Sequence, residues 1–110
     1  MLLHLLTALR LQPDAPPPTW RLNVCVAGMP VRAQQWQALF PPHAPPLAFP
    51  CVVAQGRDDP FYDWCARLAR DYAAPTLVGF DEGHRFPHAK EKNAELAEAL
   101  WRGVASGSRE

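Results

Sequence analysis

Two short turns hold the residues best suited to chemistry. Residues 55–60 (Gln-Gly-Arg-Asp-Asp-Pro) and residues 81–87 (Asp-Glu-Gly-His-Arg-Phe-Pro) each follow a short apolar run. The first turn offers a carboxylate at Asp59, and the second offers an imidazole at His84. A carboxylate that accepts a hydrogen bond from a histidine ring fixes the ring's tautomer and stabilises its protonated form. His84 is therefore a candidate general base, and Asp59 is the candidate acid that orients it.

Each of these residues also has a simpler interpretation. Asp59 precedes Pro60 at the start of a segment with helical periodicity, a pattern typical of a helix N-cap. Asp58 could replace Asp59 as the acid, and His84 could be a loop histidine bonded to nearby backbone. The position of both turns after neighbouring predicted strands favours chemistry, because working residues in parallel sheets lie beyond the carboxyl ends of the strands.

Helical and strand periodicities alternate along the chain. Helices are predicted at residues 1–11, 33–40, 60–72 and 90–104, and strands at residues 21–27, 49–54 and 76–80. Such alternation favours βαβ units with right-handed crossovers. The predicted fold class is α/β, with three parallel strands and flanking helices. The inner face of the last helix is predicted to carry Ala97, Leu100, Trp101 and Val104.

Length and composition limit the possible classes of protein. The 110 residues suffice for one domain, predicted over residues 1–104, and the polar residues 105–110 are predicted to be a disordered tail. A net charge of +0 gives no electrostatic reason to expect nucleic acid or an anionic membrane as a partner. No segment reaches the ~18 apolar residues of a membrane span. The first residues lack the basic region and cleavage site of a signal peptide.

The cysteines are an odd set with no CxxC spacing: Cys25, Cys51 and Cys65. Their positions in apolar runs or on the apolar side of a helix favour buried, reduced thiols. That pattern points to a reducing compartment, and we expect a cytoplasmic protein. A thiol enzyme is disfavoured, because none of the three lies in a cationic turn or at a helix N-terminus.

The remaining histidines and the tryptophans carry weaker signals. His88 follows His84 by four residues, but no HExxH motif or third ligand supports a metal site, and we expect no metal and no cofactor. His4 and His43 are predicted to be ordinary solvent or loop residues. The four tryptophans are predicted to be packing residues, because none joins a basic patch.

The two turns together resemble the FSH group, the family of small serine hydrolases with the α/β-hydrolase fold. The shared motifs are Gly-x-x-Asp at residues 56–59, Gly-His-x-x-Pro at residues 83–87 and a glycine-containing turn within residues 24–30. The resemblance covers about residues 1–104 and matches the C-terminal half of such a domain. It implies that Asp59 is the acid and His84 the base of a triad that cleaves carboxylic esters or similar acyl bonds.

The family's nucleophile is a serine in a Gly-x-Ser-x-Gly turn, and these 110 residues contain no such motif. Ser106 and Ser108 follow the last predicted helix, and Thr7 lies within the first one. The family's oxyanion segment and first strands are missing too. The resemblance therefore implies a serine hydrolase truncated before its nucleophile and inactive alone, with Met1 a few residues after the expected nucleophile turn. The missing N-terminal half, or another protein, is the expected partner.

A second hypothesis is a non-catalytic remnant that acts as a protein-binding module. Residues 22–26 would form an apolar strand with a free edge, and the leucine-rich residues 1–11 would lack part of the surface that they should cover. Both segments are suited to docking on another protein.

Overall fold

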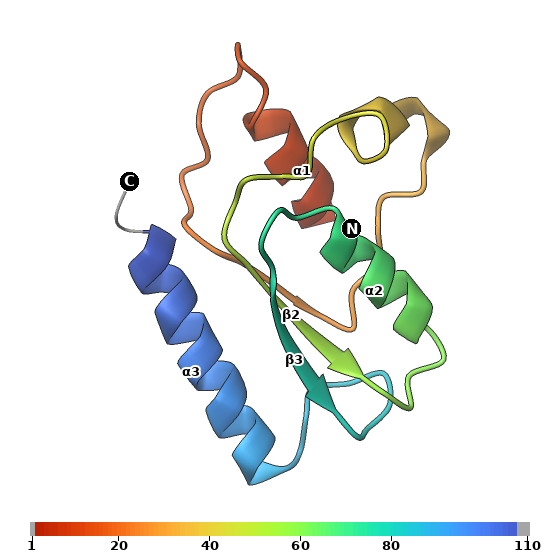
Figure 1. Ribbon diagram of the computed structural model, residues 1–110, viewed down its shortest axis with the longest axis vertical. Helices are drawn as coiled ribbons and strands as arrows, with labels where there is room; N and C mark the ends of the chain where they lie inside the picture. Colours follow the sequence, from red (N-terminus) through yellow and green to blue (C-terminus); the bar gives the residue numbers. More distant parts are fainter. Residues whose placement is uncertain (1, 108–110) are drawn as a thin grey trace.

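A three-stranded parallel sheet forms the centre of the molecule, for which the computed structural model describes residues 2–107. The strand order is β1–β2–β3. The strands are β1 (Asn23–Val26), β2 (Cys51–Gly56) and β3 (Thr76–Phe80), and the helices are α1 (Leu2–Arg10), the 3₁₀ helix η1 (Gln34–Leu39), α2 (Tyr62–Arg70) and α3 (Lys90–Gly107). Helix α3 lies on one side of the sheet, and α1 and α2 lie on the other (Figure 1). The predicted α/β fold with three parallel strands is confirmed.

The central strand β2 supplies both faces of the core, and each of its residues is buried. Cys51 and Val53 pack under α1 and α2 together with Leu68, whereas Val52 and Ala54 pack against α3 on the opposite face. This follows from the alternation of side chains along a strand whose two faces are both covered by helices. The nearly continuous apolar run of β2 is typical of such a strand.

Several predicted boundaries differ from the structure. Helix α2 begins at Tyr62 rather than at residue 60, because Asp59 and Phe61 form a hydrogen-bonded turn before it. The short helix predicted at residues 33–40 is a 3₁₀ helix at residues 34–39. Helix α3 extends to Gly107, past its predicted end at residue 104, and so includes the first three residues of the predicted tail. The rest of that tail, residues 108–110, lies outside the described residues.

The buried face of α3 differs from the predicted one. Leu96 and Ala99 are buried, whereas Trp101 is 74% exposed and Val104 is 41% exposed. A side chain at Gly103 would lie 2.7 Å from Leu22, so the glycine allows this turn of the helix to approach the chain just before β1. The prediction of Ala97, Trp101 and Val104 on the inner face was therefore wrong, because all three are exposed, whereas the half-buried Leu100 packs against the core as predicted. Neither α3 nor any other described helix is both long and apolar enough to cross a membrane.

His4 is a buried residue, and its assignment to solvent or a loop was wrong. Its exposed fraction is 1%, and its ring stacks on Phe40 with the centroids 4.8 Å apart. Nε2 lies 2.9 Å from Oδ2 of Asp71, and Nδ1 lies 2.9 Å from the hydroxyl oxygen of Tyr72. Burial raises the pKa of the Tyr72 hydroxyl, which therefore stays protonated and can donate to Nδ1. His4 thus attaches α1 to the C-terminal end of α2.

Asn23, the first residue of β1, completes this buried polar network. Its side-chain amide donates to the hydroxyl groups of Thr7 and Tyr72, at 2.7 and 2.8 Å. The side-chain carbonyl accepts a hydrogen bond of 2.7 Å from the indole N–H of Trp20. Each polar group thereby has a partner away from water, which is the condition under which burying polar side chains does not destabilise a fold.

Substitution of Asn23 with alanine should leave the buried hydroxyl groups of Thr7 and Tyr72, and the half-buried indole of Trp20, each with one partner fewer. We expect the free energy of unfolding to fall by about 2–4 kcal/mol, since each such group loses about 1–3 kcal/mol when left unsatisfied. Urea denaturation measures the effect. Gln12→Ala is the control, because Gln12 is exposed and its amide bonds only the Ala8 carbonyl oxygen. Equal stability of the two variants would contradict the role given to the network.

Candidate active site

Asp59 and His84 meet at the carboxyl ends of β2 and β3. Oδ2 of Asp59 lies 2.8 Å from Nδ1 of His84. The carboxylate is buried, with 1% of its side chain exposed, whereas the histidine side chain is 48% exposed. With Nδ1–H donating to the carboxylate, Nε2 is the ring nitrogen left to exchange protons, and it makes no hydrogen bond within residues 2–107. A histidine that acts as a general base needs this arrangement, in which a carboxylate holds one ring nitrogen and the other ring nitrogen can contact the group that loses its proton.

Each oxygen of the Asp59 carboxylate has its own hydrogen-bond partner. Oδ1 accepts a hydrogen bond of 2.7 Å from the backbone N–H of Phe61, which fixes the turn before α2, and Oδ2 faces His84. The Asp59 backbone carbonyl accepts the N–H of Tyr62, the first residue of the helix. Asp58 is exposed, and its carboxylate has no partner in the described part of the chain. The geometry therefore selects Asp59 rather than Asp58 as the partner of His84.

Backbone hydrogen bonds hold the two turns together. The N–H of Arg57 donates to the Phe80 carbonyl at 2.8 Å, and the N–H of Asp58 donates to the Glu82 carbonyl at 3.1 Å. A Cβ atom at Gly56 would lie 2.4 Å from the Glu82 carbonyl oxygen, closer than real Cβ contacts. Glycine is thus needed at position 56 for the close approach of the two chain segments, and that approach brings Asp59 to His84.

Glu82 orders the loop that carries His84, a role that the sequence motifs did not reveal. Its carboxylate accepts the backbone N–H of His88 at 2.6 Å and pairs with Arg85 at 3.0 Å. The His88 N–H bond is the main reason why the pKa of Glu82 lies below its ordinary value, and the Arg85 charge adds to it. The Phe61 ring also packs edge-on against the His84 ring, with the two ring centroids 5.5 Å apart.

His88 donates its backbone N–H to Glu82, and the described residues contain no group of three or more His, Cys, Asp or Glu side chains that could hold a metal ion. The residues present at the site suit proton transfer by an imidazole with an orienting carboxylate.

The turn after β1 reaches the same edge of the sheet. Ala27 adopts a left-handed backbone conformation with φ of 53°, which is rare for a residue with a side chain, and its N–H donates to the Ala54 carbonyl. Such strain is often found at functional sites.

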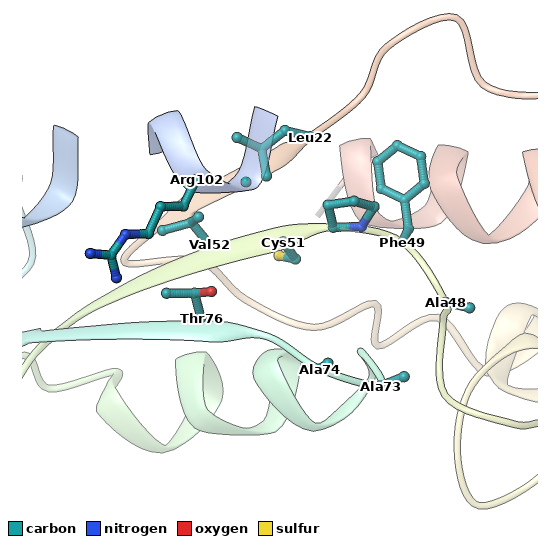
Figure 2. A pocket seen from close by; sticks show the side chains of 11 residues that line it. Leu22, Ala48, Phe49, Cys51, Val52, Ala73, Ala74, Thr76 and Arg102 are labelled. Atoms are coloured by element: carbon teal, nitrogen blue, oxygen red, sulfur yellow. The ribbon is translucent and has the colours of Figure 1, made fainter. Parts of the chain in front are cut away.

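A cavity of about 490 Å³ lies at the opposite end of the sheet, beside the amino ends of the strands, where Leu22, Thr76 and Arg102 contribute to its lining (Figure 2). It is therefore separate from Asp59 and His84.

A comparison with protein-family models matches residues 1–96 to the family described as serine hydrolase (FSH1). The match includes the Asp59 turn, the His84 turn and the sheet that carries them. No curated protein and no solved structure was found to match the chain.

Gly56→Ala tests whether the close approach of the two turns is needed. We expect the free energy of unfolding to fall by about 1–3 kcal/mol, because the new methyl group would overlap two backbone carbonyls. Gly83→Ala is the matched control, since a Cβ there would meet no atom within 4 Å and its φ is not positive. Thermal or urea unfolding of both variants gives the comparison. A Gly56 variant as stable as the Gly83 variant would contradict the role of this contact.

The Glu82 contacts predict a dependence of the loop on pH. A carboxylate whose folded pKa is lowered stabilises the structure above its ordinary value of 4.5, and this contribution is lost as the pH falls through the folded pKa. We expect hydrogen exchange at the His88 amide to lose protection, relative to its intrinsic rate, as the pH falls below the ordinary carboxyl value of 4.5 and the Glu82 carboxylate becomes protonated. Glu82→Gln should remove this pH dependence, whereas Glu95→Gln, at an exposed ion pair of α3, should retain it. Unchanged protection of wild-type His88 from neutral pH to pH 3 would refute the prediction.

Proposed function

Because the chain belongs to the serine hydrolase (FSH1) family, we propose that Asp59 and His84 are the acid and base of an acyl hydrolase that cleaves carboxylic esters or similar bonds. The observation that carries the proposal is the 2.8 Å hydrogen bond from Nδ1 of His84 to a buried carboxylate, with Nε2 left unbonded in the described residues. A cytoplasmic location is part of the proposal, and the three free cysteines support it.

The proposed reaction follows from the two nitrogens of His84. Nε2 takes the proton of a serine hydroxyl as that oxygen attacks the ester carbonyl, and Asp59 stabilises the resulting imidazolium through Nδ1–H. His84 then gives the proton to the leaving alcohol. In the second half of the reaction, Nε2 takes a proton from a water molecule as the water oxygen attacks the acyl carbon. His84 then returns that proton to the serine oxygen as the acyl–serine bond breaks, which releases the carboxylic acid and restores the serine.

The serine must come from a segment that these 110 residues do not contain, since they hold no Gly-x-Ser-x-Gly motif. The direction of α1 supports a source before residue 1, because the start of the helix is the end nearer to the carboxyl ends of the strands (Figure 1). We infer that the 110 residues alone are inactive.

The second candidate function is a protein-binding module without catalysis. The open edge of β1 supports it, because this strand pairs only with β2 within the described residues, and Val24 is 38% exposed. An unpaired strand edge is a template for a strand of another chain. The same edge would pair with the missing N-terminal half in the first proposal.

A fluorophosphonate probe, which labels activated serines, separates the two functions. The 110-residue chain should remain unlabelled. A protein extended by the in-frame coding sequence upstream of residue 1 should be labelled at a serine of a Gly-x-Ser-x-Gly turn and should hydrolyse a chromogenic ester. In that protein, Asp59→Asn and His84→Gln should each lower kcat by about 10³–10⁴-fold.

Asp58→Asn provides the matched control in the extended protein. It removes a neighbouring carboxylate that faces solvent and bonds no described residue, so kcat should stay within about twofold of wild type. Equal losses at positions 58 and 59 would argue against the assigned acid. Stop codons directly upstream, or labelling of Ser106 or Ser108 in the 110-residue chain, would overturn the proposed source of the nucleophile.

A further inference from the structure

A groove between α2 and β3 lies apart from the proposed active site. It has a volume of about 320 Å³, and we call it the α2–β3 groove; Gln55, Tyr62, Ala66, Arg70, Tyr72 and Leu77 contribute to its lining. Because β3 is an edge strand in the described sheet, nothing extends the floor of the groove beyond Leu77, which is 56% exposed. Sites that bind drug-sized ligands span roughly 300–1,000 Å³, so this one suits a compound of one or two rings.

Gln55 brings an unsatisfied polar group to this groove. Its exposed fraction is 7%, and its side-chain oxygen Oε1 is the one buried side-chain polar atom without a hydrogen-bond partner in the described residues. The paired residue on the neighbouring strand is Gly79, which offers no side chain that could bond it. Leaving a buried acceptor unpaired destabilises a fold by about 1–3 kcal/mol, so such a group calls for an explanation.

The other walls of the groove suit an aromatic ring. Tyr62 and Tyr72 provide ring surfaces, and Ala66 and Leu77 provide apolar contacts. Arg70 is exposed, and its side chain makes no hydrogen bond or ion pair within residues 2–107, so its guanidinium is available to stack on the face of a bound ring. The amide of Gln55 can rotate about its last torsion, which has a broad energy minimum, to turn Oε1 toward a donor.

We propose that the α2–β3 groove binds a small aromatic compound that carries one N–H or O–H donor. The donor bonds Oε1 of Gln55, the ring lies between Ala66 and Leu77, and Arg70 stacks on its exposed face. This site goes beyond the proposed hydrolase function, because it involves neither Asp59 nor His84 and needs no nucleophile.

Indole and indene form a matched pair of probes, since they share a shape and only indole has an N–H. We expect indole to shift the NMR signals of the Gln55 side-chain amide and the Leu77 methyl groups in the 110-residue chain. Indole should bind roughly tenfold more tightly than indene, the difference that one hydrogen bond in a site of this kind provides. Shifts that gather at Leu22 and Phe49, in the cavity at the amino ends of the strands, would overturn the proposal.

Three variants locate the interaction. Gln55→Met removes the acceptor at nearly constant volume and should abolish the preference for indole, without loss of stability because the acceptor is unsatisfied in the free protein. Ala66→Phe should fill the groove and weaken the binding of both probes. Thr76→Val removes a hydroxyl from other cavities of the molecule and should change neither affinity. Equal affinities of wild type for the two probes, or no binding of either, would refute the site.

Discussion

The backbone pairing between β2 and β3 continues past the last strand residues, and the geometry of the site depends on it. The Arg57 N–H bonds the carbonyl of Phe80, the last residue of β3, and the Asp58 N–H bonds the carbonyl of Glu82 in the turn after it. The absence of a side chain at Gly56 allows the two segments to touch. Asp59 and His84 are therefore brought together by the same hydrogen bonds that pair the strands. Rigid strand ends are suited to this task, because a proton relay requires its groups to be held within a fraction of an ångström.

This dependence explains how the hydrogen-bonded pair of Asp59 and His84 can form in a chain that contains no serine nucleophile motif. Every contact that orients Asp59 or His84 comes from the two turns or from the start of α2, including the Phe61 N–H, the Phe61 ring and the bonds of Glu82. The polar network of His4 and Asn23 acts at the opposite end of the sheet, where it attaches α1. The two ends of the sheet thus have separate tasks: one presents the proposed acid and base, and the other holds the helix that would lead to the nucleophile.

Sequence patterns predicted the features that depend on local periodicity and on short motifs. The strand β3 was predicted with its observed bounds, and the pairing of Asp59 with His84 followed from the position of both turns after adjacent strands. Long-range packing could not be predicted in this way. His4 is buried because its ring bonds Asp71 and Tyr72, which are far from it in the sequence. The inner face of α3 is set by the close approach of Gly103 to Leu22 and not by Trp101, the largest apolar side chain of that helix. Nor did any motif mark Glu82 or the unsatisfied Gln55, since both roles arise from contacts between segments.

The central claim is that the strand-end turns by themselves fix His84 in the tautomer that a triad base requires. The ¹⁵N chemical shifts and one-bond couplings of the His84 ring, measured by NMR on the 110-residue chain above the pH at which the ring is protonated, test this directly. The account predicts a neutral ring with its proton on Nδ1, directed at Asp59, and with Nε2 unprotonated. A neutral ring that carries its proton on Nε2, or that exchanges rapidly between the two forms, would contradict it.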